Sequence, residues 1–386
     1  MDDRPRPAEP RADLVALAAS LAPGIAERAA AYDAGDLFPD EDLKELVAAG
    51  YTAITVPADL GGQGAGALDL VAAQARLAQA SPATALAVNM HLHGVGILAE
   101  AMRPASEPFL RQVVTGGAVL GGGFSEPASG GNWWYQASTA EPVEGGGWRL
   151  RGHKTFFTGY PGLTHLFLTA AVETPSGREP IGFLVPKPAE GVRVAAEWKA
   201  MGMRATGSHA ILVEDLLIPD ECVVGRGLGI AGSFLACAHW SWLSFASVFL
   251  GAAEAAHEHV VRTLPARRNE GLGQGLAELP GVQQAVGEMR MLLDAARATL
   301  YAAARRPVTD PVEHYGRMAG AKLFACEAAL KVCTLALRTA GGSGYLRSNP
   351  LERLLRDAHA GLLLPPSHDA TLQWLGRVEL GQGAAP

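Results

Sequence analysis

Two segments near the middle of the chain combine hydroxyl, aromatic and glycine residues in a spacing suited to a flat ring with polar edges. The first, FSEPASGGNWW, spans residues 124–134, and the second, GHKTFFTG, spans residues 152–159. A turn-forming loop offers backbone and hydroxyl hydrogen bonds to the edge of such a ring. Adjacent aromatic residues on a strand supply an apolar wall. The two segments therefore predict a ring-binding site, with Ser125, Phe156 and Thr158 as its first candidates.

Composition and charge limit the class of protein. The chain has 386 residues, of which 48% are hydrophobic and 18% charged, as expected for a globular protein with a substantial core. The formal net charge is -7, and the densest basic cluster is the pair Arg267–Arg268, which argues against a general nucleic-acid binder. No uninterrupted apolar run reaches the length of about 18 residues that a membrane span requires, so no transmembrane helix is predicted.

The N-terminus and the cysteines indicate the compartment. Residues 1–5 read MDDRP, with acids and prolines where a signal peptide would continue into an apolar core. The four cysteines show no CxxC spacing, which predicts reduced core thiols in a cytoplasmic protein. Residues 257–259 read HEH, but helical positions two apart do not share a face, so no metal site is expected there or elsewhere.

The pattern of apolar residues divides the chain into three parts. Residues 1–116 carry alanine-rich segments with helical periodicity, whereas residues 117–226 carry short strand-like runs between glycine, proline and charged turns. Residues 227–386 return to helical periodicity. Three long helices are expected in this last part, at about 231–264, 282–304 and 312–340. The predicted fold class is therefore mainly α with a β domain.

Five further motifs occur in a fixed order along the chain. They are DLGG at 59–62, KAMGMRAT at 199–206, VEDLLIP at 213–219, AGGSGY at 340–345 and PLERLLRDA at 350–358. Together with the two central segments, they resemble the motifs of the acyl-CoA dehydrogenase family over nearly the whole chain. The resemblance implies an N-terminal helical domain (1–116), a middle β-barrel (117–226) and a C-terminal helical bundle (227–386).

The resemblance implies FAD as the cofactor and assigns one set of residues to its ring. Ser125 stands where a family threonine hydrogen-bonds the flavin ring, and Phe124 offers backbone groups to the pyrimidine end. Phe156 stands where an aromatic residue packs on the isoalloxazine, and Thr158 where a hydroxyl meets the ring near N5. Gly131 replaces a family serine that contacts both substrate thioester and flavin.

A second set of residues is assigned by resemblance to the rest of the cofactor. Arg268 and Arg338 could neutralise the FAD phosphates, and Gly341 and Gly342 permit close approach of the backbone to a pyrophosphate. Ser367 is a further candidate from the C-terminal loop. In the family the two glycines come from a neighbouring subunit, so the resemblance implies a homotetramer or a homodimer.

The pattern breaks where the family carries its catalytic base. By resemblance, most members have a glutamate seven residues after the alanine of the RDA motif, which removes the α proton of an acyl thioester; here that residue is Pro365. A minority of members place the glutamate on the first long C-terminal helix, at the position of Ser241, and the neighbouring family arginine is Trp242. Neither usual position holds a carboxylate.

Three explanations remain open. The first hypothesis is an FAD-dependent oxidoreductase that oxidises an acyl thioester, on CoA or a carrier protein, with a displaced base such as Asp369, Glu254 or a histidine. The alternative is a two-component flavin monooxygenase acting on a secondary metabolite, which requires reduced flavin and O2 but no α-proton base. The third is a non-catalytic flavin-binding homologue. An enzyme of this kind requires a small-molecule substrate and either an electron-transfer partner or a flavin reductase.

Two histidines are catalytic candidates besides Asp369. By resemblance, the helix that carries His91 and His93 faces the flavin, and monooxygenases of this fold use a histidine from about this helix. The two side chains point to different faces of the helix, so at most one enters the pocket, and His93 is the candidate. His239 is the other candidate, because it directly precedes Ser241 and Trp242.

Overall fold

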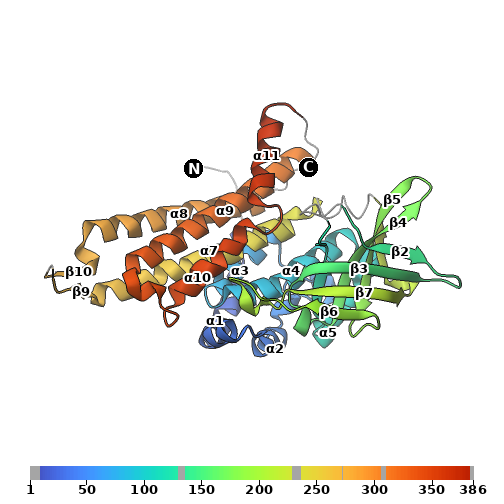
Figure 1. The fold of residues 1–386 in the computed structure, drawn as a ribbon, viewed down its shortest axis with the longest axis horizontal. Coiled ribbons are helices and arrows are strands. Elements are labelled where there is room, and N and C mark those ends of the chain that lie inside the picture. Colours follow the sequence, from blue (N-terminus) through green and yellow to red (C-terminus); the bar gives the residue numbers. More distant parts are fainter. Residues whose placement is uncertain (1–8, 129–134, 228–235, 272, 306–309, 383–386) are drawn as a thin grey trace.

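The computed structural model describes residues 9–128, 135–227, 236–271, 273–305 and 310–382 (Figure 1). The first helices are α1 (Ala12–Gly35), α2 (Asp40–Ala48), α3 (Ala67–Ala78), α4 (Pro82–Ala101) and α5 (Arg103–Gly116). The strands of the sheet follow: β1 (Leu120–Gly123), β2 (Thr139–Pro142), β3 (Trp148–Phe157), β4 (His165–Thr174), β5 (Gly177–Pro186), β6 (Val192–Ala196), β7 (His209–Ile218) and β8 (Val223–Arg226). The last part contains α7 (Ala238–Thr263), α8 (Pro280–Arg305), α9 (Pro311–Ala340), α10 (Pro350–His359) and α11 (His368–Glu379), with a short hairpin of β9 (Arg268–Asn269) and β10 (Gln274–Gly275).

Three helices begin at the same local signal, a polar N-cap followed by a proline. The Ser81 hydroxyl accepts the Thr84 amide at the start of α4, and the Asp310 carboxylate accepts the Glu313 amide at the start of α9. The Asn349 side chain does the same for α10. A side-chain acceptor satisfies one orphan amide of the first turn, and proline tolerates the first position because its missing N–H is not needed there.

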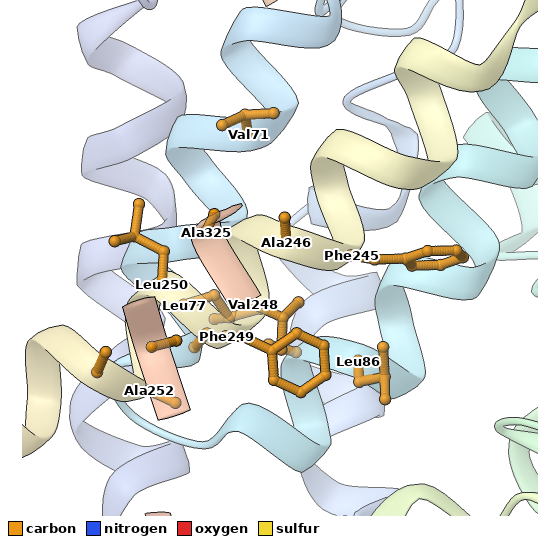
Figure 2. Close-up of a cluster of buried hydrophobic side chains, with 14 of the residues drawn as sticks. Val71, Leu77, Leu86, Phe245, Ala246, Val248, Phe249, Leu250, Ala252 and Ala325 are labelled. Atoms are coloured by element: carbon orange, nitrogen blue, oxygen red, sulfur yellow. The ribbon is translucent and has the colours of Figure 1, made fainter. Parts of the chain in front are cut away.

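Helix α7 forms the centre of the helical core. It packs against α3, α4, α8, α9 and α10, and its residues Phe249 and Val248 are completely buried (Figure 2). Small residues such as Gly251 allow α3 to approach closely, since a Cβ there would lie 2.2 Å from the Ala75 carbonyl oxygen. The core therefore joins the N-terminal and C-terminal helices into one packed body.

An eight-stranded sheet lies beside this helical body, with the strand order β6-β7-β3-β2-β4-β5-β8 and β1 paired in parallel with β4 (Figure 1). Alternate residues of β3, including Trp148 and Leu150, face the buried interior of the sheet. The pairing of β3 with β7 shifts register between Lys154 and Phe157, which marks a bulge at the end of β3. That bulge is adjacent to the candidate ring-binding residues.

The long C-terminal helices agree with the sequence prediction to within a few residues. Helices α8 and α9 differ by at most two residues at either end from the expected 282–304 and 312–340, and the end of α9 at Ala340 matches the expected end. Helix α7 is described from Ala238, and residues 228–235 at the start of the expected 231–264 lie outside the described residues. Helices α5, α10 and α11 were not assigned from the sequence.

One helix of the described residues, α1, is long and apolar enough to pass a length-and-composition test for a membrane span. Its apolar residues Leu14, Ala18 and Ile25 are buried against the helical core, and α1 packs on α3. Core helices of water-soluble proteins pass the same test, so this helix is weak evidence for a membrane span.

The junction between the sheet and α10 tolerates no side chain at Gly202. A Cβ at this position would lie 2.3 Å from the Arg356 carbonyl oxygen. We expect Gly202→Ala to lower the free energy of unfolding by about 1–3 kcal/mol, because backbone atoms must move to admit the methyl group. Gly320→Ala in α9, where an added Cβ meets nothing within 4 Å, is the control and is expected to leave the melting temperature unchanged or raised. Equal melting temperatures for wild type and Gly202→Ala would contradict this account.

Candidate functional site

The bulge at the end of β3 turns Phe156 out of the sheet. Phe156 has φ of 55° and its side chain is 62% exposed, whereas the adjacent Phe157 is completely buried. A positive φ is uncommon for a bulky residue and is seen where the surrounding structure imposes it. The Trp198 ring meets Phe156 edge to face, with 6.0 Å between ring centroids. The bulge thus presents an aromatic wall to the outside of the sheet, of the kind a flat ring can cover.

Thr158 lies beside this wall at the end of a chain of hydroxyl groups. Its Oγ1 is 2.8 Å from the Ser208 Oγ, which is 2.7 Å from the Thr206 Oγ1. Thr206 in turn donates to the Met203 carbonyl oxygen at 2.9 Å. Because the Thr206 hydroxyl donates to that carbonyl, its oxygen accepts a hydrogen bond from the Ser208 hydroxyl. The Ser208 oxygen in turn accepts a hydrogen bond from the Thr158 hydroxyl. A buried hydroxyl oriented in this way can present a lone pair to a ring donor.

The loop after β1 is fixed against β3. The Ser125 carbonyl oxygen accepts the Thr155 amide at 2.8 Å, which places Ser125 next to the bulge. The Phe124 ring packs on Phe167 with 5.4 Å between centroids. Phe124 and Ser125 therefore lie beside the segment that carries Phe156 and Thr158, and the role of these four residues in binding a ring stays a prediction. Gly131 lies outside the described residues.

His93 approaches this group from α4. A narrow cavity has His93 and Phe124 in its wall, together with Gly94, Leu120, Gly122 and Phe167. The His93 Nδ1 lies 2.9 Å from the Asn89 carbonyl oxygen, so Nδ1 carries the proton and Nε2 is an acceptor. Burial lowers the pKa of His93 to about 4, which leaves the imidazole neutral near pH 7. This side chain can accept a proton beside the candidate ring site.

His91 has a structural role on the opposite face of α4. Its Nδ1 accepts the Leu120 amide at 2.9 Å, and its Nε2 donates to the Thr52 carbonyl oxygen at 2.8 Å. Burial lowers the pKa of His91 to about 4 as well. The neutral ring therefore ties β1 to the N-terminal helices, and only His93 of the pair reaches the cavity.

Apart from Ser367, the second set of predicted cofactor residues lies near β9, at the other end of the long axis. Arg268 is in β9, far from β3 in Figure 1, and its Nη2 donates to the Gly273 carbonyl oxygen at 3.1 Å. Its neighbour Arg267 donates to the Ala340 carbonyl oxygen at 2.8 Å, next to Gly341. The exposed members of this group are Arg268, Arg338, Gly341 and Gly342. One copy of the chain does not bring them to the ring-binding residues.

Lys322 holds the loop where most family members carry the base. Its buried ammonium group donates to the carbonyl oxygens of Gly361, Leu364 and Pro366 at 2.8, 2.7 and 3.0 Å. Burial lowers the pKa of Lys322. Pro365 lies within this anchored loop and offers no proton acceptor on its side chain.

The alternative base position is also apolar in character. The Trp242 ring is buried against Tyr315, with 4.9 Å between centroids, and Tyr315 contacts Trp374 of α11 at 4.3 Å. Ser241 donates only a long hydrogen bond of 3.4 Å to the Ala238 carbonyl oxygen. Three aromatic rings in edge-to-face and tilted contact therefore fill the region in which an arginine and a glutamate would otherwise operate.

The remaining catalytic candidates already have partners. The His239 Nε2 lies 3.1 Å from Glu100, whose carboxylate also accepts the Trp240 indole at 2.7 Å. The hydrogen bond from His239 is the main cause of a lowered pKa of Glu100. Glu254 is held by Arg297 at 2.5 Å and by Gln79 at 2.6 Å.

Asp369 and Ser367 lie at the start of α11. The Asp369 side chain is fully exposed and 2.8 Å from the His368 Nδ1, while the His368 Nε2 lies 2.7 Å from Glu327 on α9. The Ser367 carbonyl oxygen accepts the Thr371 amide at 3.0 Å. These contacts fix the start of α11 on α9, and none of them involves a ring-binding residue.

Several residues that shape the site were not assigned a role from the sequence. They are Glu126, Gln136, Lys154, Thr169, Trp198, Ser208 and Lys322. Alternation in β3 places Lys154 in the same inward row as Trp148 and Leu150, and a charged residue in such a row requires a buried partner. That signal was available in the sequence.

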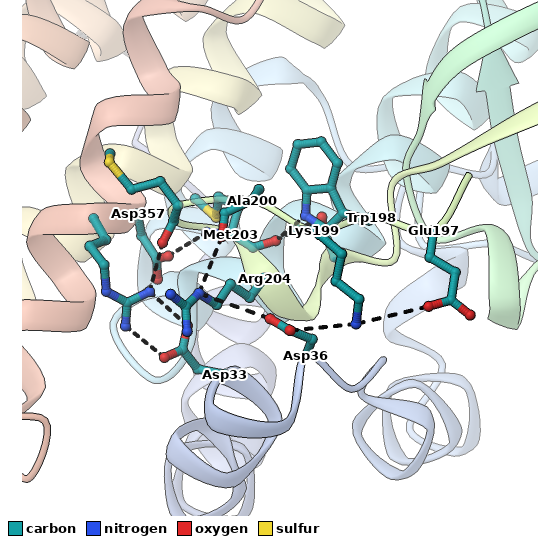
Figure 3. A network of polar contacts seen from close by, with 12 residues as sticks. Asp33, Asp36, Glu197, Trp198, Lys199, Ala200, Met203, Arg204 and Asp357 are labelled. Atoms are coloured by element: carbon teal, nitrogen blue, oxygen red, sulfur yellow. Dashed lines mark hydrogen bonds and ion pairs between the residues drawn. The ribbon is translucent and has the colours of Figure 1, made fainter.

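A network of charges fixes the turn that carries Trp198 (Figure 3). The Trp198 indole donates to the Met203 carbonyl oxygen at 2.9 Å, and the Met203 amide donates to the buried Asp357 at 2.6 Å. Burial raises the pKa of Asp357 to about 6. Arg356 donates to Asp33 on α1 at 2.6 Å. The aromatic wall is thus fixed to helices from both ends of the chain.

Comparison with known proteins agrees with this arrangement. Family models match in chain order: acyl-CoA dehydrogenase N-terminal domain at residues 16–116, middle domain at 121–216 and C-terminal domain at 243–363. "Putative acyl-CoA dehydrogenase YdbM" of Bacillus subtilis (strain 168) is 32% identical over 92% of this chain and 93% of its own length. The chain belongs to the acyl-CoA dehydrogenase family. Family membership makes it a flavin-dependent oxidoreductase with the family's helical, β and helical architecture.

Other similar proteins include a nitrososynthase and several proteins of known structure. The amino sugar nitrososynthase RubN8 of Streptomyces rubradiris is 31% identical over 95% of this chain and 91% of its own length. The solved structure of KijD3 in complex with dTDP has a TM-score of 0.87 at 28% identity, covering 97% of this chain and 98% of that one. Another KijD3 structure contains FMN and a dTDP-linked amino sugar. Butyryl-CoA dehydrogenase from Megasphaera elsdenii shares the fold, with a TM-score of 0.88 at 22% identity.

The buried neutral histidines predict sensitivity to acid. Their folded-state pKa of about 4 lies below the usual 6.5, so the unfolded chain binds more protons between pH 4 and 6.5, and stability falls as the pH falls through that window. We expect His91→Gln to reduce this slope by up to about 1.4 kcal/mol per pH unit. Urea unfolding midpoints at about pH 4.5, 5.5 and 7 measure how steeply stability depends on pH. His359→Gln, at an exposed position, is the control, and an unchanged slope in His91→Gln would refute the assignment.

Proposed function

We propose that this member of the family is a flavin-dependent monooxygenase that oxygenates a small molecule. The observation that carries the proposal is the absence of a carboxylate at both family base positions, one occupied by Pro365 in the loop that Lys322 anchors and the other by Ser241. Removal of the α proton of an acyl thioester requires a positioned carboxylate base, whereas oxygen transfer to an amine needs only a weak base. The nitrososynthase RubN8, similar over nearly its whole length, supports oxygenation, and an amine nitrogen is the substrate atom that this likeness favours.

The residues at the bulge fit a flavin ring. Phe156 is an exposed aromatic side chain on a backbone that the bulge constrains, and Trp198 stands against it. We infer that these two rings cover the isoalloxazine and exclude water from one side, while Ser125 and Thr158 supply hydrogen bonds to its edge. Reduced flavin, when bound, supplies the two electrons with which one atom of O2 is transferred to substrate and the other leaves as water.

His93 is the residue that we place in the role of proton acceptor in this reaction. Its Nε2 is the acceptor nitrogen of a neutral imidazole, and His93 lies in the cavity wall with Phe124. We infer that it accepts the proton that an attacking amine or similar nucleophile must lose. A base whose pKa lies below the working pH is fully available, although it is a weaker base than an unperturbed histidine.

A second candidate function is oxidation of an acyl thioester, the reaction the family is named for. The 32% identity to YdbM favours it. The reaction would need a displaced base, and His93 is the candidate that faces the cavity with Phe124, since Asp369, Glu254 and His239 are held by other partners. The monooxygenase hypothesis is preferred because it needs no strong base.

The proposal also includes FAD as the cofactor, a homo-oligomeric assembly and a cytoplasmic location. Gly341 and Gly342 leave open space where a Cβ would stand, which suits close approach of a pyrophosphate. Because Arg267, which precedes β9, contacts Ala340 next to them, and β9 lies far from β3 in Figure 1, the assembly we propose is a tetramer or dimer in which one subunit binds the ring and a neighbour the phosphates. A flavin reductase would supply reduced cofactor. Binding of FMN in preference to FAD would contradict the pyrophosphate-binding role that we assign to Gly341 and Gly342.

Oxygenation is tested with reduced flavin. Purified protein supplied with reduced FAD or FMN, O2 and a panel of amines should form oxygenated product, and we expect His93→Asn to lower kcat/KM by about 10²–10⁴-fold. In the wild type the acid limb of the pH profile should lie near pH 4, since Nε2 loses its acceptor role only below the pKa of His93. His359→Asn is the control at an exposed position. Product formation by His93→Asn at the wild-type rate would eliminate the proton-transfer role.

Dehydrogenation is tested without oxygen. Anaerobic wild-type protein with bound FAD should not lose its flavin absorbance when butyryl- or octanoyl-CoA is added, because no positioned carboxylate removes the α proton. Pro365→Glu adds a carboxylate to a loop that Lys322 anchors through backbone atoms, and any bleaching it gains identifies the missing base. Rapid bleaching of the wild type would instead establish dehydrogenation and reject the monooxygenase proposal.

A further inference from the structure

A fully buried ion pair lies directly behind the ring-binding loop. Lys154 of β3 and Glu126 contact each other through Nζ and Oε1, and their side chains are 0% and 1% exposed. The Lys154 ammonium also donates to the Gln136 Oε1 at 2.9 Å and lies 3.4 Å from the Thr169 Oγ1. Burying two charges is expensive, and such pairs add little net stability compared with apolar residues of the same volume. Stability alone is therefore a poor explanation for this pair.

The Glu126 carboxylate joins two parts of the chain. It accepts the Ala137 amide at 2.5 Å, the Ser138 amide at 3.1 Å and the Ser138 hydroxyl at 2.6 Å. Burial opposes its charge, but the Lys154 ammonium and these hydrogen bonds outweigh burial and lower the pKa of Glu126. One ionised group thus fixes the start and the end of the segment that runs from β1 to β2.

The same cluster fixes the backbone that faces the proposed flavin ring. The Thr169 hydroxyl lies 3.2 Å from the carbonyl oxygen of Gly123 and 2.7 Å from the Gln136 Oε1, and it donates its one proton to either of them. Ser125 is held by the amide of Thr155, the residue after Lys154. The backbone of Phe124 and Ser125 therefore lies between two residues, Gly123 and Glu126, that hydrogen-bond within this cluster.

We propose that Glu126 and Lys154 are positioning residues for the flavin: they do not touch it but hold the Phe124–Ser125 backbone in the geometry that binds its ring. The proposal rests on the proposed flavin site. A positioned backbone loses less conformational entropy on binding than one that must first be ordered, so loss of the pair weakens flavin affinity more than it weakens the fold.

The test separates affinity from stability by removing one charge or both. We expect Glu126→Gln and Lys154→Met each to raise the Kd for FAD and FMN, measured by quenching of flavin fluorescence, by about tenfold or more. The double variant Glu126→Gln/Lys154→Met leaves no unpaired buried charge, so its flavin-free melting temperature should return toward that of the wild type while its Kd stays raised. Lys331→Met, which removes an exposed lysine paired with Glu288 on the helical bundle, is the control and should change neither quantity.

The outcomes distinguish this proposal from the one it rests on. If the wild type binds no flavin at micromolar concentration, the flavin site itself is wrong. If the wild type binds and the double variant binds with the same Kd, the pair is only a structural ion pair and the positioning role is overturned. If a single variant fails to fold, the double variant still decides the matter, because it carries no uncompensated charge.

Discussion

The site depends first on how the sheet is held against the helices. Asp357, buried on α10, accepts the Met203 amide, and Arg356 beside it reaches Asp33 on α1. These two consecutive residues of α10 thereby fix the 199–206 turn between the first helix and the C-terminal bundle. The Trp198 indole and the Thr206 hydroxyl both donate hydrogen bonds to the Met203 carbonyl oxygen. A shift of this turn would move the aromatic wall and the hydroxyl chain together.

Much of the fold was predictable because its signals are local. Helical periodicity gave the ranges of α8 and α9 to within two residues, and capping residues followed by proline mark the starts of α4, α9 and α10. The missing carboxylate at Pro365 was also predictable, because the absence of a residue type is visible in the sequence itself.

The rest depended on contacts that sequence spacing does not encode. The two phenylalanines at the end of β3 are chemically alike, and only the bulge decides that Phe156 is exposed while Phe157 is buried. Spacing along α4 separated His91 from His93, but the tautomer of each ring follows from partners on Asn89, Leu120 and Thr52. The inward position of Lys154 was a usable signal, whereas Lys322 lies on an alanine-rich helix that gives no sign of the loop it binds.

The way in which Lys322 holds the C-terminal loop has a consequence for how the chemistry at this position can change. Its three hydrogen bonds go to main-chain oxygens, and none involves the side chain at position 365. A substitution at position 365 can therefore change the group displayed there without removing a hydrogen bond that holds the loop. In evolutionary terms, this loop is a fixed support on which selection can exchange one side chain.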